Sequence, residues 1–222
     1  MGFLKVNRNA VQFGHLRRLE PVSKNWGLDR GTPIDRYYIE KFLQKNAAEI
    51  QGKILEFGDS TYARKYGGSK VENIEVMTIE KDNPNSTIIA DLTKAKNVPS
   101  DEFDCIICTQ VLNYIYDFNL ALKQLYRILK PGGVILTTVP VVSKTCLKES
   151  WTNYWRFTSR CSQMIFKEVF PEESIRVESY GNVLTSVSFL HGLAVEELAK
   201  EELDFKDPEY EMIIAVRAKK PK

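Results

Sequence analysis

The chain has 222 residues, 43% of them hydrophobic and 27% charged, and its 31 basic and 29 acidic residues leave a net charge of +2. This composition fits a globular domain with a sizeable core, and a charge so near zero gives no long-range field to gather nucleic acid or an anionic membrane. No apolar run approaches the roughly 20 residues of a membrane-spanning helix, and residues 1–10 lack the apolar segment of a secretory signal. We therefore expect a cytoplasmic protein without membrane insertion.

The first half of the chain predicts one helix and four strands. Residues 1–33 are polar and interrupted by Gly and Pro, so we expect an N-terminal extension that wraps a domain of residues 34–222. After Pro33, apolar residues recur at helical spacing over residues 34–50, and Gly52 follows. Short buried strands are expected at residues 53–58, 74–80, 86–90 and 103–110.

The second half predicts further alternation. Apolar residues at helical spacing from Phe118 to Leu129 predict a helix, which Lys130-Pro-Gly-Gly133 is expected to end, because Pro cannot continue a helix and Gly permits a left-handed exit. The remaining patterns are helical at residues 159–170 and 184–198 and strand-like at residues 134–139, 175–180 and 212–218.

Strands that alternate with helices and read as nearly continuous apolar runs indicate a parallel sheet covered on both faces. Such sheets bind ligands at the carboxyl ends of their strands, where the strand order reverses. We therefore expect the site in the turns that follow Phe57, Ile79, Ala90 and Gln110.

The cysteines do not predict a metal site. Cys105-x-x-Cys108 has the spacing of half a zinc site, but residues three apart on a strand point to opposite faces. No second Cys pair or His pair completes a ligand set. We expect small buried thiols.

The first turn and the two strand ends after it favour a nucleotide-like ligand. Gly58 lets the backbone approach a cofactor closely, and Glu80 follows it by 22 residues, near the distance at which an acid binds ribose hydroxyl groups. Asp91 ends the third strand and offers a carboxylate to an adenine amino group. The alternative is that Glu80 and Asp91 only cap helices or turns.

Residues 101–113, the helix up to residue 129 and Lys130-Pro-Gly-Gly133 with its strand together resemble class I S-adenosylmethionine-dependent methyltransferases of the type 11-like group. The resemblance covers about residues 50–140. It implies an α/β, Rossmann-like class I methyltransferase fold, with a mostly parallel seven-stranded sheet and helices on both faces, and S-adenosylmethionine as cofactor.

Carried onto this sequence, the resemblance implies a set of cofactor-binding residues. The methionine end would meet Glu56, Gly58, Asp59 and Ser60, the ribose Glu80, the adenine region Asp91, and the sulfonium Gln110 and Val111. The loop departs from the family because its second and third glycines are replaced by Ser60 and Tyr62. Ser60 is small enough for the position, whereas Tyr62 either enters the pocket or stacks on the ligand.

Two segments, residues 28–38 and 153–158, resemble a narrower bacterial subgroup whose members are fused to, or encoded beside, glycosyltransferases. This resemblance implies a sugar or glycan precursor as substrate and a glycosyltransferase as partner. Arg36, next to Tyr37, is a candidate clamp for the methionine carboxylate, and the alternative is a salt-bridge cluster that fixes the extension. Tyr154, Trp155 and Arg156 are candidate sugar-binding residues, and the alternative is a hydrophobic lid packed on the core.

A sugar hydroxyl is a weak acid, so its methylation calls for a base. The candidates are His191, for which a structural role is the more common reading, and Tyr154. The leading hypothesis is an S-adenosylmethionine-dependent methyltransferase acting on oxygen of a sugar, glycan or small metabolite. The alternative is an inactive methyltransferase fold that binds a glycosyltransferase or glycan. A dinucleotide enzyme is disfavoured, because a full Gly-x-Gly-x-x-Gly is absent. The sequence leaves monomer and homo-oligomer open.

Overall fold

The computed structural model describes residues 14–147 and 152–222. Its seven strands form one sheet in the order β3-β2-β1-β4-β5-β7-β6. Only β7 runs antiparallel to its neighbours β5 and β6, and the other pairings are parallel. The expected mostly parallel seven-stranded sheet is confirmed. The strands are β1 Gly52–Phe57, β2 Val71–Thr78, β3 Ile88–Ile89, β4 Phe103–Thr109, β5 Leu129–Pro140, β6 Ile175–Tyr180 and β7 Ile213–Lys219.

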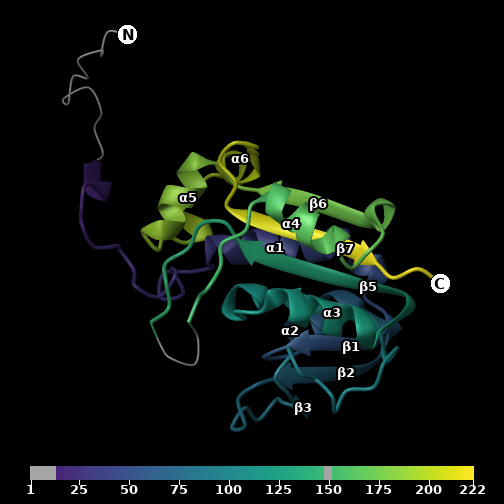
Figure 1. Ribbon diagram of the computed structural model, residues 1–222. Helices are drawn as coiled ribbons and strands as arrows, with labels where there is room; N and C mark the ends of the chain where they lie inside the picture. Colours follow the sequence, from purple (N-terminus) through teal and green to yellow (C-terminus); the bar gives the residue numbers. More distant parts are fainter. Residues whose placement is uncertain (1–13, 148–151) are drawn as a thin grey trace.

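Helices cover both faces of this sheet, as Figure 1 shows. One face packs against α3 and α4, and the other packs against α1 and α2. The helices are α1 Ile34–Lys45, α2 Thr61–Gly67, α3 Phe118–Ile128, α4 Ser159–Lys167, α5 Val183–Leu190 and α6 Lys200–Asp204. A short 3₁₀ turn, η4 (Leu112–Tyr114), follows β4.

Strand β4 illustrates how the two faces share the core. Ile106 and Cys108 lie in the apolar cluster on one face, and Cys105 and Ile107 lie in the cluster on the other. The two thiols therefore diverge, as the sequence predicts. Burial raises the pKa of both thiols well above the usual range, which keeps them protonated and suits a packing role.

Two expected helices are shorter than their patterns predict. The helix expected over residues 34–50 ends at Lys45, and Ala47–Glu49 form a separate 3₁₀ turn. The helix expected over residues 184–198 stops at Leu190. Gly192 there has φ +68, and a Cβ on it would lie 2.3 Å from the Ser23 carbonyl oxygen, so close packing of the extension requires glycine at the break.

Three further boundaries differ from expectation. Strand β2 runs from Val71 to Thr78 rather than over residues 74–80, and β3 keeps only Ile88–Ile89 of residues 86–90. Helix α4 ends at Lys167, not at residue 170. The turn Lys130–Gly133 lies inside β5, because that strand starts at Leu129 and absorbs the turn as a register shift against β4.

The described part of the N-terminal extension, residues 14–33, is tied to the end of α5. The backbone amides of Val22 and Ser23 donate to the His191 carbonyl oxygen at 2.8 and 3.1 Å. In Figure 1 this segment runs along the side of the molecule toward which the parallel strands point. Residues 1–13, including the stretch in which no secretory signal is expected, lie outside the described residues. Within the described ranges, no helix is long and apolar enough to cross a membrane.

Candidate active site

Two cavities lie side by side at the carboxyl edge of the sheet. The first, here called the adenosine-side cavity, has a volume of about 240 Å³ and lies at the ends of β1, β2, β3 and β4. The second, the polar cavity, has a volume of about 320 Å³ and lies between the extension, α1, α2 and the ends of β1, β4 and β5. The two cavities share four lining residues, Phe57, Thr109, Gln110 and Tyr114. This is the edge at which the sequence predicts the site.

Gly58 forms the first turn of the site. Its φ of +82 is one that L residues rarely adopt, and a Cβ built there would have no neighbouring atom within 4 Å. Gly58 lines the adenosine-side cavity, so its bare backbone borders open space. A ligand can therefore approach the main chain closely here, as a phosphate- or nucleoside-binding turn requires.

Glu56 fixes the helix that follows this turn. Its carboxylate accepts hydrogen bonds from the amides of Tyr62 at 3.0 Å and Ala63 at 2.8 Å, the first residues of α2. The side chain is 2% exposed. Burial raises its pKa to about 7, although the two amide hydrogen bonds act in the opposite direction. Glu56 also lines the polar cavity, so it shapes the loop and borders the ligand space.

The altered glycine loop remains open enough to border a cavity. The Asp59 carboxylate accepts from the Thr61 amide at 2.8 Å, and the Ser60 hydroxyl accepts from Arg64 Nε at 2.9 Å. Asp59 lines the polar cavity, whereas Ser60 lines neither. Tyr62 lines the wall of the polar cavity and stacks on Tyr66 with ring centroids 6.4 Å apart.

Glu80 and Asp91 occupy different positions relative to the cavities. Glu80 lies two residues beyond β2 and lines neither cavity, although the adjacent Ile79 does. Asp91 lines the adenosine-side cavity, and its Oδ1 accepts from the amide and hydroxyl of Thr93 at 2.9 and 2.7 Å. The turn-capping alternative thus accounts for Asp91 Oδ1, and Asp91 Oδ2 forms an ion pair with Lys94 Nζ at 3.5 Å. Adenine and ribose contacts for these two acids stay predictions.

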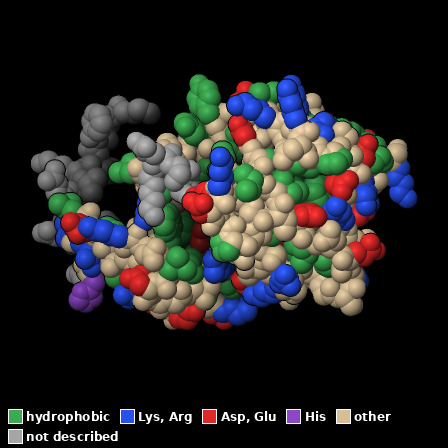
Figure 2. Space-filling model, turned by 90° about the horizontal axis from the view of Figure 1, so that it is seen from below, with side chains coloured by type: hydrophobic (Ala, Val, Ile, Leu, Met, Phe, Trp, Pro, Cys, Tyr) green, Lys and Arg blue, Asp and Glu red, His purple; other side chains and the backbone are tan. Residues whose placement is uncertain are grey.

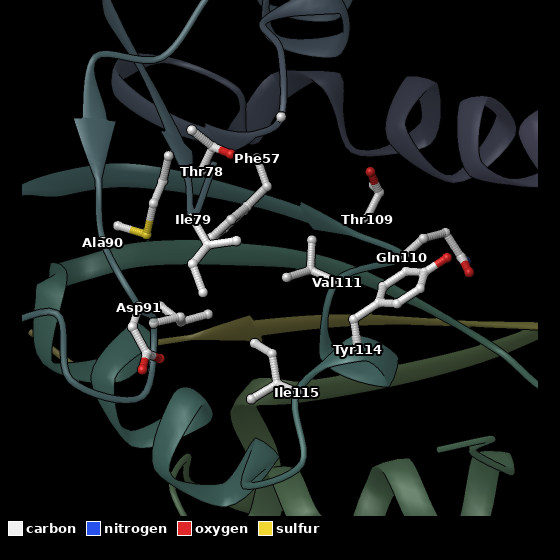
Figure 3. Close-up of a pocket in the computed structure, with 13 residues that line it drawn as sticks. Phe57, Thr78, Ile79, Ala90, Asp91, Thr109, Gln110, Val111, Tyr114 and Ile115 are labelled. Atoms are coloured by element: carbon white, nitrogen blue, oxygen red, sulfur yellow. The ribbon is translucent and has the colours of Figure 1, made fainter. Parts of the chain in front are cut away.

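Apolar side chains line most of the adenosine-side cavity. In Figure 3, Ile79, Val111 and Ile115 point toward its middle, and Gln110 and Tyr114 lie at its right-hand end. That end adjoins the polar cavity. An apolar pocket with a few polar groups suits a flat heterocycle. Val111 and Gln110 line this cavity, and their contact with a sulfonium stays a prediction.

Gln110 holds an unusual backbone conformation at the junction of the cavities. Its φ is +56, and its amide donates to the Thr138 carbonyl oxygen at 2.8 Å. Left-handed non-glycine residues cost free energy and cluster at functional sites. We therefore infer that the conformation serves to aim the side chain at the junction.

Gln110→Gly is expected to raise the free energy of unfolding by about 0.5–1 kcal/mol, because relief of left-handed strain exceeds the entropic cost of glycine. Urea denaturation measures this gain, and calorimetry should show weaker S-adenosylhomocysteine binding. Asp101→Gly is the matched control, because Asp101 has the same φ of +56 and lines neither cavity. It should leave ligand binding unchanged, and a binding loss in both variants would exclude a specific role for Gln110.

The charged residues of the extension and of α1 separate into two groups. Arg30 forms an ion pair with Glu197, which ties the extension to the domain. Tyr37 turns toward α6, where its hydroxyl donates to Asp204 at 2.7 Å, and it lines neither cavity. Arg36, by contrast, is exposed, lines the polar cavity and forms no ion pair within the described residues. The clamp hypothesis therefore fits Arg36 and not Tyr37.

Three further residues line the polar cavity: Trp26 and Asn113, which sequence reasoning did not select, and Asp35, which it noted only as part of the charged segment 28–38. Asn113 is 1% exposed, and its Oδ1 has no hydrogen-bond partner within the described part of the chain. Asp35 comes from the first turn of α1, and Trp26 comes from the extension. A buried acceptor without a partner is costly, so Asn113 marks a position for a ligand that donates a hydrogen bond.

The expected sugar-binding residues pack mainly as a lid. Trp155 Nε1 donates to the carbonyl oxygens of Ile115 and Tyr116, and the Trp155 ring contacts Phe118 edge-on at 5.3 Å. Arg156 donates to three backbone carbonyl groups, those of Ser143, Lys144 and Trp155. Neither residue lines a cavity. These contacts match the hydrophobic-lid alternative.

The two candidate bases also lie outside the cavity linings. Tyr154 is 51% exposed, and its ring contacts Tyr116 at 5.5 Å. His191 caps the end of α5, where its carbonyl oxygen binds the extension. Among the described residues, no group of three or more His, Cys, Asp or Glu side chains is placed to hold a metal ion.

Comparison with known proteins identifies the sequence family. Residues 34–178 match the family model described as a methyltransferase domain. The curated relatives include the ubiquinone/menaquinone biosynthesis C-methyltransferase UbiE of Pectobacterium carotovorum, 34% identical over 90 residues, which are 40% of this chain and 33% of that protein. They also include the arginine-hydroxylase NDUFAF5 of rat mitochondria, 28% identical over 119 residues, 54% of this chain and 30% of that protein. The matches therefore span about a third of the length of these relatives.

Solved structures share the fold at low sequence identity. An S-adenosylmethionine-dependent methyltransferase from Archaeoglobus fulgidus superposes with a TM-score of 0.55 at 12% identity, covering 83% of this chain and 94% of its own. The N-methyltransferase NodS from Bradyrhizobium japonicum, solved with S-adenosylhomocysteine, gives 0.55 at 14% identity, covering 93% and 95%. The [4+2]-cyclase SpnF gives 0.56 at 12% identity, covering 86% and 84%. Because a cyclase shares it, the fold alone does not fix the reaction.

Proposed function

Because this chain belongs to the methyltransferase domain family, we propose that it transfers the methyl group of S-adenosylmethionine to an oxygen atom of a sugar or related small metabolite at the two joined cavities. Membership of the methyltransferase domain family supports this enzyme class, and the solved structures with the same fold include S-adenosylmethionine-dependent methyltransferases. The position of the cofactor and the identity of the acceptor are the proposed parts.

One observation carries the proposal: an apolar and a polar cavity meet at Gln110 on the carboxyl edge of the sheet. S-adenosylmethionine has a comparable division, since its adenine is a flat heterocycle and its amino-acid end is charged. The adenosine would lie against Gly58 and Val111, and the sulfonium would lie near Gln110. The reactive methyl group would then face the polar cavity, where an acceptor binds.

The residues of the polar cavity fit the charged end of the cofactor. The Arg36 guanidinium has no ion pair within the described ranges and can take a carboxylate in bidentate fashion. Asp59 and Glu56 place carboxylates where an ammonium group would be favoured.

The chemistry asks little of the protein beyond alignment. S-adenosylmethionine supplies an activated methyl group on a sulfonium. The protein's residues hold the acceptor atom in line and exclude water, which can account for a large part of the acceleration. The cavity walls that would do this are Tyr114, Trp26 and the loop after β5.

A polyhydroxylated acceptor suits the polar cavity better than an apolar one. Its lining combines hydrogen-bonding side chains from α1, β1 and β4 with the aromatic Trp26. The resemblance of residues 28–38 and 153–158 to methyltransferases linked to glycosyltransferases supports a glycan precursor, with a glycosyltransferase as partner.

Figure 2 shows basic and acidic side chains interspersed over one face of the molecule, without a continuous patch of either sign.

Arg36→Gln is expected to weaken S-adenosylhomocysteine binding about tenfold, the loss of a charge-assisted hydrogen bond at an exposed position. Binding of 5′-methylthioadenosine, which lacks the amino-acid end, should not change. Calorimetric titration of both ligands tests this. Lys41→Gln, on the same helix but paired with Asp204, is the control. Equal losses for the two ligands would remove Arg36 from the amino-acid subsite.

Label transfer tests the proposed reaction. The protein is incubated with methyl-labelled S-adenosylmethionine and a panel of methyl glycosides, amino sugars and nucleotide sugars. Labelled O-methyl product is the expected result. Binding of the cofactor without transfer to any member would favour a glycan- or glycosyltransferase-binding role for this fold.

A further inference from the structure

If the chain is an O-methyltransferase, as proposed above, the acceptor hydroxyl group must lose its proton during the reaction. The inference that follows rests on that proposed function. Neither His191 nor Tyr154 lines a cavity. The proton acceptor must therefore come from the polar cavity itself. Six of its lining residues carry charged or titratable side chains: Asp35 and Arg36 on α1, Glu56, Asp59, Tyr62 and Tyr114.

Four of these groups are poor candidates for the base, each for its own reason. Both oxygens of Glu56 accept from the first amides of α2. Asp59 is exposed, so water competes with an acceptor for its carboxylate, whereas Asp35 is half-buried. Burial raises the pKa of the Tyr62 hydroxyl well above the usual range, so it does not ionise near neutral pH. Arg36 is a cation and cannot accept a proton.

Asp35 and Tyr114 remain, and of these two only Asp35 carries a carboxylate, whose setting suits a base. It is half-buried in the first turn of the 12-residue α1, and its Oδ1 accepts from the Arg36 amide at 2.8 Å. Its Oδ2 has no hydrogen bond within the described residues, so one oxygen is free to take a proton. Burial raises the pKa of Asp35 to about 6, against the opposing effects of the Arg36 amide and charge. A base with a pKa near the working pH is the more effective one.

Asn113 supplies a second, independent observation. Asn113 lines the same cavity, and its buried Oδ1 has no partner in the described part of the chain. A hydroxyl-rich acceptor would satisfy this oxygen with one hydroxyl group and present another to Asp35. The lining of the polar cavity thus contains both a hydrogen-bond acceptor, Asn113, and a carboxylate, Asp35.

We propose that Asp35 is the proton acceptor of the methyl transfer and that Asn113 orients the sugar by accepting a hydrogen bond from a neighbouring hydroxyl group. In this step the acceptor oxygen forms a bond to the methyl carbon as the carbon–sulfur bond breaks. The electron pair of that bond stays on sulfur and gives S-adenosylhomocysteine. The hydroxyl proton passes to Asp35 Oδ2.

Sinefungin probes the position of Asp35 without knowledge of the acceptor. In this analogue of S-adenosylmethionine, a carbon that bears an amino group replaces the sulfonium and its methyl group. Its ammonium group points where the methyl group would leave. We expect the wild-type protein to bind sinefungin about tenfold more tightly than S-adenosylhomocysteine at pH 7.5, because Asp35 attracts the ammonium.

In Asp35→Asn this tenfold preference should fall to near one, with the affinity for S-adenosylhomocysteine within twofold of wild type. Glu40→Gln is the matched control, since Glu40 lies on the same helix and pairs with Lys65 outside the polar cavity. It should keep the full preference. In wild type the preference should also decline as the pH falls through about 6, where Asp35 becomes protonated.

The outcomes separate this inference from the proposed function. If wild type and Asp35→Asn both bind the two ligands and show the same preference for sinefungin, the role of Asp35 is overturned. The proposed methyltransferase site then stands. A folded Asp35→Asn that no longer binds S-adenosylhomocysteine places Asp35 in the cofactor subsite and also overturns it. Failure of wild type to bind either ligand contradicts the proposed function itself. If Asp35→Asn does not fold, a wild-type preference that is constant from pH 5 to 8 overturns the proposal.

Discussion

Gly58→Ala is expected to weaken S-adenosylhomocysteine binding by about 100-fold while it lowers the free energy of unfolding by only about 1–2 kcal/mol. The stability loss is the cost of a left-handed alanine at φ +82. The new methyl group meets no protein atom within 4 Å, so it enters the space that borders the adenosine-side cavity. There it would collide with the ligand, and overpacking of this kind costs up to about 3 kcal/mol.

Gly132→Ala provides a matched control for backbone strain. Gly132 also has φ +82, its Cβ would touch only the Lys222 side chain at 3.4 Å, and it lies near the start of β5, at the opposite end of the sheet. Its stability loss should be similar, with ligand affinity within twofold of wild type. Denaturant unfolding and calorimetry measure the two effects. Equal binding losses in both variants would mean that general strain, not ligand contact, explains Gly58.

Glu56→Gln is expected to change how stability depends on pH. The pKa of Glu56 is raised from 4.5 to about 7 in the folded chain, chiefly by burial. The folded state therefore holds this proton more tightly, so the stabilisation is complete below pH about 4.5 and is lost as the pH rises through about 7. A shift of this size corresponds to about 3 kcal/mol.

The stability of wild type relative to Glu56→Gln should accordingly fall by up to about 3 kcal/mol between pH 5 and pH 8. Urea unfolding of both proteins across this range gives the difference directly. Asp35→Asn removes the other carboxyl of the site with a raised pKa and should preserve the Glu56 dependence. A difference that is constant with pH would show that Glu56 is not buried as a high-pKa group.

The sheet could be predicted because its strands are continuous apolar runs. The run from Phe103 to Thr109 is buried on both faces, which is typical of a strand in a parallel sheet covered by helices. The parallel sheet in turn predicts that the site lies at the carboxyl edge, in the turns that contain Gly58 and follow Gln110. Strand β3 is harder, since its pairing is limited to Ile88 and Ile89, and a two-residue strand leaves almost no pattern.

Helix α2 could not be read from its own residues. It is seven residues long and buries only Ala63 and Gly67, so it carries no apolar stripe. Its start is fixed by Glu56, which lies on the preceding strand and accepts from the Tyr62 and Ala63 amides. Because a carboxylate on another element fixes the start of α2, the residues of α2 alone do not predict this helix.

The polar cavity was the least predictable part of the site. Asn113 is far in the sequence from Trp26 and Asp35, and the three residues line one cavity because the extension, α1 and η4 pack around the end of β4. A residue's hydrogen bonds also decide its role, as Arg156 shows. Its guanidinium could bind a sugar by residue type, but three backbone carbonyl groups occupy it. A signal for Asn113 exists only in the structure, as a buried oxygen without a partner among the described residues.

The most direct test of the central claim is calorimetric titration of the purified protein with S-adenosylmethionine and, separately, S-adenosylhomocysteine, with NAD as the comparison ligand and copurified ligand excluded by mass spectrometry. We expect both adenosyl ligands to bind at one site per chain with micromolar affinity, and NAD not to bind. Absence of binding by either adenosyl ligand to folded protein would contradict the assignment of the two cavities.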